Sequence, residues 1–348
     1  MQIRPTALED FVSRVFQAAG VPVEEAGQAA ASLVGSNLRG HDSHGVMQVS
    51  GYVRHLRAGT LVPGVELEVL SETPSLLVTD AGRGLGSVQT ARLIERLLPK
   101  AKEQGVACAT MRSAGHLGRL GEWAERVAQK GVAGLIATND NGVLQCVAPP
   151  GGVEPRISTN PIAIGVPTGD GPRVLDVSTS VVANGKVRLK HAEGKRCPPG
   201  WLQDVDGQPT TDPAVRVREP RGSLLPLGGE EGGYKGFGLG LFFDMLVGGL
   251  SGGFSPPAPE SALLLNNALL VIWTPERFAG ESHFVGQVDE LIAHVRSTRT
   301  KSGVDAIRVP GDRSAAVLEE RTKNGIVLDD GTWKALTDLA KEMGVDVP

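Results

Sequence analysis

The chain has 348 residues, of which 41% are hydrophobic and 21% charged, and its formal net charge is −4. This length exceeds one typical domain and permits a large core. The balanced charge contains no lysine or arginine run, which argues against nucleic acid and a basic membrane patch, and no apolar segment is long enough to span a bilayer.

The first elements expected are helices at 6–19, 23–38 and 47–56, because apolar residues recur there at helical spacing. The N-terminal segment lacks the apolar core of a signal peptide. The three cysteines, Cys108, Cys146 and Cys197, are isolated, which predicts neither a disulfide framework nor a zinc site. A reducing cytoplasm suits such a chain.

Short apolar alternations at 65–78 predict strands, and a glycine-rich segment follows at 80–86. Its glycines, Gly82, Gly84 and Gly86, have the spacing G-x-G-x-G, whereas a dinucleotide-binding turn has G-x-G-x-x-G. A turn into a helix at 87–104 is therefore favoured over a Rossmann site.

The rest of the chain alternates further strands and helices. Strands are expected at 106–111, 135–138, 162–166, 174–180 and 262–273, and helices at 120–130, 285–296, 312–323 and 332–343. Residues 190–232 are rich in turn signals, and the apolar stretch from Gly233 to Leu250 reads as a buried helix.

The segment Gly40-His41-Asp42-Ser43-His44-Gly45 carries the strongest chemical signal. Its bracketing glycines let the polar side chains turn toward one volume, and a histidine beside a hydroxyl or carboxylate is suited to moving a proton near neutral pH. The alternative is a polar loop in which Asp42 or Ser43 caps the next helix. His116 is a second histidine bracketed by glycines.

Two further segments are candidates for ligand binding. The strand ending at 176–180 finishes in a carboxylate and hydroxyls, a common place for a ligand. At 233–238, glycines and Lys235 stand where a helix begins, which suits a phosphate. A tight turn with a surface lysine explains the second segment equally well.

Taken together, the motifs resemble those of the malate/L-sulfolactate/L-lactate dehydrogenase family, which includes ureidoglycolate and 2,3-diketogulonate dehydrogenases. The resemblance rests on LRGHDSHGVMQVSGYVRHLRAG near the start, GHLG at 115–118, STNPIAIGVP at 158–167, DVSTSVVANGK at 176–186, GYKGFGLG at 233–240 and VPG at 309–311. These motifs span nearly the whole chain in matching order.

The resemblance implies an NAD(P)-dependent oxidoreductase that interconverts a 2-hydroxy acid and a 2-oxo acid. It implies a non-Rossmann α/β fold, with a substrate and dimerisation part at 1–75 and 255–348 and an NAD(P)-binding part at 76–254. It also implies a homodimer with the active site near the interface.

By the same resemblance, His116 is the acid/base for an alcohol substrate and His44, beside Ser43, orients or polarises that substrate. Gln48, Tyr52, Thr159 and Asn160 are expected to line the substrate pocket. The segments expected at the cofactor, NAD or NADP, are Asp176, Val177 and Ser178, then Lys235 and Gly236, and then Pro310, Gly311 and Asp312.

Two residues depart from the family pattern. The cyclic ketimine reductases of the family carry an aspartate where this chain has Lys186, and lysine has no acceptor to replace it. This difference favours the hydroxy-acid branch over the ketimine reductases. Many hydroxy-acid members carry an arginine at the position of Gln48, so this chain needs another cation or a less acidic substrate.

Two other classes of protein fit the sequence less well. A binding protein that kept the fold and lost the chemistry is disfavoured by the presence of both histidines and the Lys235 segment. A metal hydrolase is disfavoured because His41 and His44 have no matching ligand set nearby in the sequence.

Overall fold

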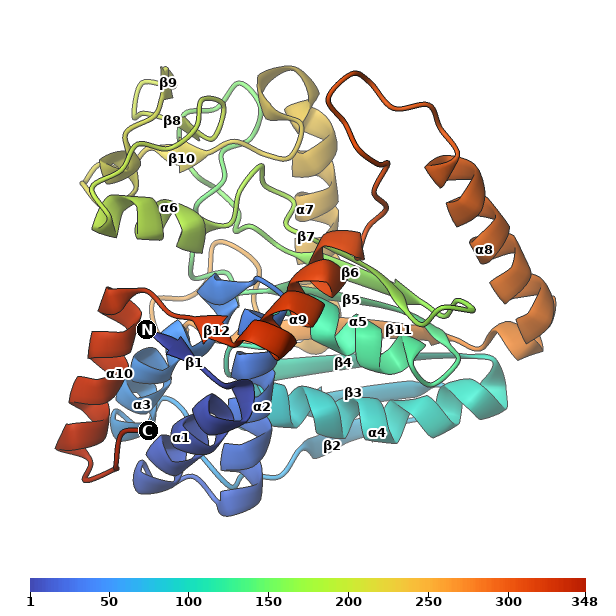
Figure 1. Cartoon of the computed structure of the whole chain (residues 1–348), viewed down its shortest axis with the longest axis horizontal. Helices are drawn as coiled ribbons and strands as arrows, with labels where there is room; N and C mark the ends of the chain where they lie inside the picture. Colours follow the sequence, from blue (N-terminus) through green and yellow to red (C-terminus); the bar gives the residue numbers. More distant parts are fainter.

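A seven-stranded mixed β-sheet forms the centre of the computed structural model, which describes all residues from 1 to 348 (Figure 1). Its strands, in spatial order, are β2 (Glu68–Glu72), β3 (Leu76–Asp80), β4 (Val106–Ala114), β11 (Asn266–Trp273), β5 (Ala133–Asn139), β6 (Ile162–Val166) and β7 (Arg173–Val177). Only β3 and β4 are parallel neighbours, and every other pair is antiparallel. A Rossmann sheet is mostly parallel, so the expected non-Rossmann α/β fold is confirmed.

Helices cover both faces of this sheet. Two helices, α4 (Gly86–Gln104) and α5 (Leu120–Ala128), pack on one face, where Leu270 and Ile272 of β11 join their apolar core. The long helix α7 (Gly229–Ser251) packs on the other face against Leu269. Successive side chains of a strand point to opposite faces, so β11 is buried on both sides and reads as a continuous apolar run.

A separate helical core is built from both ends of the chain. It contains α1 (Pro5–Ala18), α2 (Val23–Leu38), α3 (Val49–Arg57) and α10 (Asp330–Glu342), and 25 buried apolar residues join them. The short strands β1 (Gln2–Ile3) and β12 (Ile326–Val327) pair antiparallel, which brings the termini close together (Figure 1). The segment 255–348 also supplies β11, so both segments of the expected domain division contribute to the central sheet.

A small lobe occupies the region that was expected to be loop-rich. It contains α6 (Asn184–Ala192) and a three-stranded sheet of β8 (Leu202–Gln203), β9 (Pro209–Thr210) and β10 (Ser223–Leu224). No helix is predicted from the sequence at α6, because Val187 is its only buried residue and no apolar face recurs. Eight buried residues, including Cys146 and Cys197, form the core of this lobe.

The remaining helices are α8 (Glu281–Arg296) and α9 (Asp312–Asn324). No residue of α8 is buried, and Figure 1 shows this helix at the far end of the sheet from the termini. None of the helices is both long and apolar enough to cross a membrane. The helices expected from apolar spacing are all present, with ends that differ by at most a few residues.

Candidate active site

The GHDSHG segment folds into a short 3₁₀ turn, Asp42–His44, that the rest of the chain holds in place. The Asp42 carboxylate does not cap a helix. It accepts a hydrogen bond from Asn37 Nδ2 at 2.7 Å and pairs with Arg321 of α9 at 2.6 Å. Asn37 Oδ1 accepts from the Val46 N–H at 2.8 Å, and its side chain fills the space where a Cβ on Gly45 would lie. The turn is thus fixed at both ends, and His44 projects from it.

The other candidate residues lie at one edge of the central sheet. Strands β4 and β5 are both antiparallel to β11, and β5 and β7 are both antiparallel to β6. The carboxyl ends of β4, β5 and β7 therefore share one edge. His116, Asp140 and Ser178 follow these three strands, so the topology gathers residues from distant parts of the chain at this edge.

At this edge the two expected histidines meet directly. His44 Nδ1 lies 3.1 Å from His116 Nε2, and the rings stack with their centroids 5.2 Å apart. The Tyr52 hydroxyl lies 2.8 Å from His116 Nδ1 and donates to the His116 carbonyl oxygen at 3.1 Å. Both ring nitrogens of His116 therefore have partners within the protein, whereas His44 Nε2 has none.

Burial keeps both histidines neutral near pH 7. It lowers the pKa of His116 from 6.5 to about 3, and the neighbouring His44 lowers that pKa further. Burial also lowers the pKa of His44; Asp176 opposes this shift, and the positive charges of Lys186 and Arg119 reinforce it. A neutral imidazole has one donor and one acceptor, so the pair can form a directed chain of hydrogen bonds.

The loop that carries His116 is fixed by neighbouring strands. Asn266 Oδ1 accepts from the Leu117 N–H at 3.1 Å, and Asn266 Nδ2 donates to the Asn139 carbonyl oxygen at 2.9 Å. Gly86, at the start of α4, packs directly under this loop, and a Cβ there would overlap the carbonyl groups of Gly115 and His116. The glycine-rich segment at 80–86 thus serves as the expected turn and also supports His116.

The residues expected in the substrate pocket are held mainly by other protein groups. Gln48 Nε2 donates to the Ser43 carbonyl oxygen at 2.7 Å, so Gln48 holds the histidine turn. The Thr159 carbonyl oxygen accepts from Thr179, and Asn160, which is 1% exposed, donates to Asp244 of α7 at 2.8 Å.

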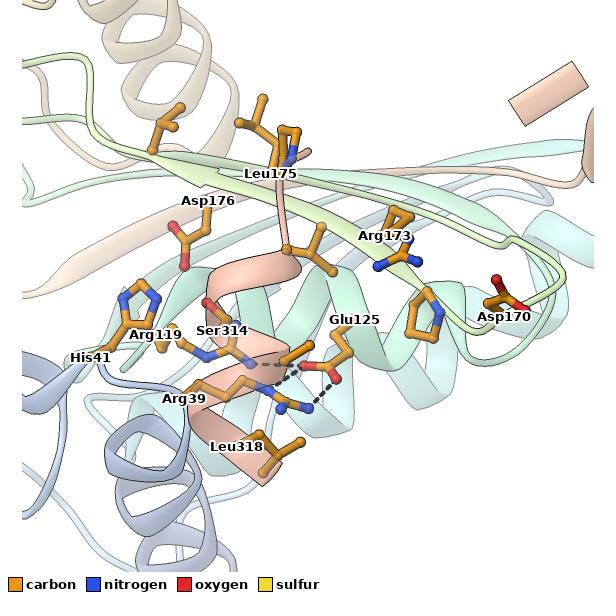
Figure 2. A pocket seen from close by; sticks show the side chains of 16 residues that line it. Arg39, His41, Arg119, Glu125, Asp170, Arg173, Leu175, Asp176, Ser314 and Leu318 are labelled. Carbon is orange, nitrogen blue, oxygen red and sulfur yellow. Dashed lines mark hydrogen bonds and ion pairs between the residues drawn. The ribbon is translucent and has the colours of Figure 1, made fainter. Parts of the chain in front are cut away.

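A cavity of about 460 Å³ runs from His41 along β7 to the start of α9 (Figure 2). It is lined by Arg39, His41, Arg119, Glu125, Asp170, Pro172, Arg173, Val174, Leu175, Asp176, Val177, Pro310, Gly311, Ser314, Ala315 and Leu318. Four of the residues expected at the cofactor are among them: Asp176, Val177, Pro310 and Gly311. The volume lies within the range of small-molecule and cofactor pockets.

Three arginines and three carboxylates line the cavity, and two of the arginines form a cluster with Glu125. Glu125 pairs with Arg39 and also with Arg119 at 2.9 Å, which leaves one net positive charge in this group. The Nε atoms of Arg119 and Arg173 are buried without a hydrogen-bond partner. Arginine guanidinium groups fit phosphate oxygens, so the side of the cavity lined by arginines suits the pyrophosphate of a dinucleotide.

The other residues expected at the cofactor lie outside the cavity lining. Lys235 is exposed on α7 with its Nζ 5.6 Å from the centre of the Tyr234 ring, and Gly236 packs against Leu227. The Ser178 hydroxyl bonds within its own turn, to Ser180. Asp312 stands behind the wall and accepts from Arg173 at 3.2 Å.

Several site residues carry no signal in the sequence. Arg39, Arg119 and Glu125 form a charged cluster only because α2 and α5 meet beside the sheet. His41 was visible in the GHDSHG segment, but its position at the cavity was not. Its pKa is lowered to about 4 by burial, against the opposing charge of Asp176. No group of three or more His, Cys, Asp or Glu residues is arranged to hold a metal ion.

Comparison with known proteins agrees with this geometry. The model of the malate/L-lactate dehydrogenase family matches residues 3–337. The chain is 35% identical to a malate dehydrogenase of Pyrococcus horikoshii over 97% of this chain and 94% of that protein. The solved structure of malate dehydrogenase from Pyrococcus horikoshii OT3 has a TM-score of 0.90 at 30% identity and covers 100% of this chain and 97% of that chain.

The alternative function, a cyclic ketimine reductase, is represented among the solved structures by a protein that is less similar to this chain. A delta1-piperideine-2-carboxylate reductase from Pseudomonas syringae has a TM-score of 0.83 at 29% identity, covering 98% of this chain and 100% of that chain. Other relatives are named as hydroxycarboxylate, sulfolactate and lactate dehydrogenases. The chain therefore belongs to the malate/L-lactate dehydrogenase family of oxidoreductases, which interconvert 2-hydroxy acids and 2-oxo acids with a nicotinamide cofactor.

Proposed function

We propose that this enzyme oxidises a 2-hydroxy acid, or reduces the corresponding 2-oxo acid, with His44 and His116 acting together as the acid/base. The observation that carries this proposal is the 3.1 Å contact between His44 Nδ1 and His116 Nε2. The Tyr52 hydroxyl occupies the other ring nitrogen of His116. Two coupled histidines titrate as a pair, so the transferred proton belongs to both.

The hydrogen bonds define a path for this proton. The Tyr52 hydroxyl donates to the His116 carbonyl oxygen, so its own oxygen accepts from His116 Nδ1–H. His116 Nε2 then carries a lone pair and accepts from His44 Nδ1–H. In this arrangement His44 Nε2 is the free basic atom that faces the substrate hydroxyl group.

Oxidation then removes a proton from the hydroxyl group and a hydride from the carbinol carbon. His44 Nε2 takes the hydroxyl proton, and the contact between His44 Nδ1 and His116 Nε2 lets the two rings share the positive charge, which Asp176 stabilises on His44. A nicotinamide cofactor bound in the cavity would supply the acceptor for the hydride that leaves the carbinol carbon. In the reverse direction the pair returns the proton to the carbonyl oxygen. In this arrangement His44 is the base that faces the substrate and His116 is its hydrogen-bonded partner, whereas the resemblance assigns the base to His116 and the orienting role to His44.

Residues of the cavity hold the cofactor in this proposal. The cavity arginines suit the pyrophosphate, and the α9 start at Pro310 and Gly311 closes the far wall. Asp176 accepts from the Gly121 N–H at 2.8 Å, which fixes the carboxylate between the cavity and the histidine pair. Thr159 and Asn160, expected in the substrate pocket, and Lys235, expected at the cofactor, have supporting roles in this proposal, since Thr159 bonds to Thr179, Asn160 bonds to α7 and Lys235 lies on the surface of that helix.

The test is a turnover assay with the purified protein. NADH and NADPH are each combined with pyruvate, oxaloacetate, a branched 2-oxo acid, sulfopyruvate and a cyclic ketimine. Turnover with a 2-oxo acid is expected, with His116→Ala and His44→Ala each at least about 100-fold slower, since general acid/base catalysis contributes 10²–10⁴-fold. Near-normal kcat in His116→Ala together with inactive His44→Ala would remove His116 from the relay.

We further propose that the enzyme works as a homodimer joined through α7. The outer face of this helix exposes Leu239, Phe242, Met245, Leu246 and Leu250 at spacings of three and four residues, each between 43% and 66% exposed. Monomeric proteins rarely expose such a contiguous apolar stripe. Two copies of one helix can pack this stripe on itself across a two-fold axis.

Light scattering tests the dimer. Phe242→Asp is expected to give monomers, because a carboxylate would be buried in the contact. Phe278 is equally exposed at 63% but lies outside α7, so Phe278→Asp is the matched control and should leave the mass unchanged. A Phe242→Asp protein with the mass of the wild type would place the interface elsewhere.

A further inference from the structure

We propose that Asp170 makes the enzyme select NAD(H) over NADP(H), because its carboxylate lies where the adenosine half of the cofactor would bind. The inference rests on the proposed function, since it concerns the cofactor of the same site. The cavity of about 460 Å³ along β7 is lined by both Asp170 and His41. Figure 2 shows these two residues at opposite ends of the cavity, with Arg39 and Arg119 between them.

The histidine pair fixes the direction in which a dinucleotide would lie in this cavity. His41 directly precedes the short turn that carries His44, so the His41 end is the one next to the acid/base. With the nicotinamide at that end, the adenosine half extends to the other end, beyond the arginines that suit the pyrophosphate. Strand β7 rises about 3.3 Å per residue, so Asp176 and Arg173 are about 10 Å apart along it, and Asp170 lies further on.

Asp170 is the one carboxylate of the cavity lining that has no partner in the protein. Glu125 pairs with two arginines, and Asp176 accepts from a backbone N–H of α5 at 2.8 Å. The Asp170 side chain is exposed and forms no ion pair or hydrogen bond. A carboxylate only accepts hydrogen bonds, and the hydroxyl groups of a ribose can donate them, so NAD(H) would supply the missing partner.

The turn between β6 and β7 holds Asp170 at the cavity. The Asp170 N–H donates to Thr168 Oγ1 at 3.3 Å, and that hydroxyl donates to the Gly171 carbonyl oxygen. The Gly169 N–H donates to the Asp289 carboxylate of α8 at 3.1 Å, and a Cβ on Gly169 would lie 2.8 Å from that carboxylate. Backbone contacts therefore set the position of Asp170 and leave its carboxylate available.

NADP(H) carries a phosphate in place of the ribose 2′-hydroxyl, and this end of the cavity has no free cation to receive it. Arg173 and Arg296 both pair with Asp312, at 3.2 and 2.7 Å. Together with Asp170, this group contains two arginines and two aspartates, so its charges balance. A second phosphate would lose the hydrogen bond that the hydroxyl donates and would add repulsion from the Asp170 carboxylate.

The experiment titrates NADH and NADPH separately into the purified protein and follows the fluorescence of the nucleotide. Wild-type protein should bind NADH about 10–100-fold more tightly, because NADPH lacks one hydrogen bond to a charged acceptor and adds a like charge. Asp170→Asn leaves one net positive charge in the arginine group. It should bring the two affinities within about 3-fold of each other, chiefly by strengthening NADPH binding.

Control variants separate the charge of Asp170 from the shape of its turn. Asp170→Glu should retain the preference for NADH, because the carboxylate remains. Asp206→Asn removes the same charge from an exposed loop outside this cavity and should leave both affinities unchanged. Asp170→Asn should melt at the wild-type temperature, because the exposed side chain makes no contact that the fold would lose. A wild-type protein without a preference for NADH, or an unchanged preference in Asp170→Asn, would overturn the proposal.

The binding measurement does not depend on turnover. If wild-type protein prefers NADH through Asp170 but reduces no 2-oxo acid, the proposed reaction fails and the assignment of Asp170 stands. If it binds both nucleotides equally and reduces 2-oxo acids with either, the reaction stands and the assignment of Asp170 fails. If neither nucleotide binds, the cavity does not hold the cofactor and both proposals fail.

Discussion

Asp140, a buried carboxyl group that follows β5, gives a sharp test of the electrostatics around the sheet edge. It is 8% exposed, and neither of its carboxylate oxygens has a hydrogen-bond partner. Burial raises its pKa from 3.8 to about 7; the nearby Ser158 hydroxyl opposes this shift, and the negative charge of Asp244 adds to it. We therefore expect the free energy of unfolding of Asp140→Asn to increase relative to that of the wild type as pH rises.

The sign and size follow from proton linkage. The folded-state pKa lies above the unfolded value, so between pH 3.8 and about 7 the folded protein binds more protons. Its stability then falls as pH rises, by about 1.4 kcal/mol per pH unit for this group. Asparagine removes the group. Relative to wild type, Asp140→Asn should gain about 2 kcal/mol in free energy of unfolding between pH 5 and pH 7, because the slope declines as the folded-state pKa is approached.

Urea denaturation at pH 5 and pH 7 measures this gain. The lowered pKa values of His41 and His116 give the opposite pH dependence, but they are present in both proteins and cancel in the difference. Asp206→Asn makes the same chemical change on an exposed loop and should show no gain. A difference between Asp140→Asn and wild type that is the same at both pH values would refute the reasoning.

Three other substitutions test the site. Tyr52→Phe leaves the Nδ1 atom and the carbonyl oxygen of His116 without a partner. It should lower the free energy of unfolding, measured in urea, by about 1–3 kcal/mol and lower kcat about 10–100-fold. Unchanged values would exclude Tyr52 from the relay. Gly86→Ala should cost about 3 kcal/mol or more and abolish turnover, because its Cβ overlaps the backbone that carries His116; a fully active variant would contradict the packing. Arg119→Met should weaken NADH binding at least about 10-fold by titration, since Glu125 then retains one cation only; unchanged affinity would place the cofactor outside the cavity.

The sequence predicted the helices and central strands well because these elements have strong local periodicity. It could not predict the order of the strands, since pairing depends on contacts between distant residues. The clearest case is β11, whose apolar run between 266 and 273 predicts a buried strand but not a place between β4 and β5. The small lobe was missed for the opposite reason, because α6 and three two-residue strands carry almost no local pattern.

The candidate site was predictable as a set of residue types and not as an arrangement. Two histidines bracketed by glycines indicate proton chemistry, and the family resemblance indicates the reaction. Nothing local relates His44 to His116, which are 72 residues apart and meet only because the 3₁₀ turn of His44 and the loop after β4 lie side by side. The roles of Tyr52 and Gln48 likewise follow from tertiary contacts, which turn both side chains toward other protein groups.

The proposed dimer and the acid/base pair are linked through α7. Its buried side carries Asp244, which is 2% exposed and accepts from Asn139 and Asn160 at 2.8 Å each. The carbonyl of Asn139 in turn holds Asn266, the residue that fixes the loop after His116. If a second copy covers the outer face of α7, the helix is held more firmly on the sheet. The hydrogen bonds that run from Asp244 through Asn139 to Asn266 are then held more firmly as well. We therefore expect the monomeric Phe242→Asp protein to lose kcat more than cofactor affinity, although the substitution lies outside the site. Full kcat in a monomer would show that the sheet edge is rigid without the partner.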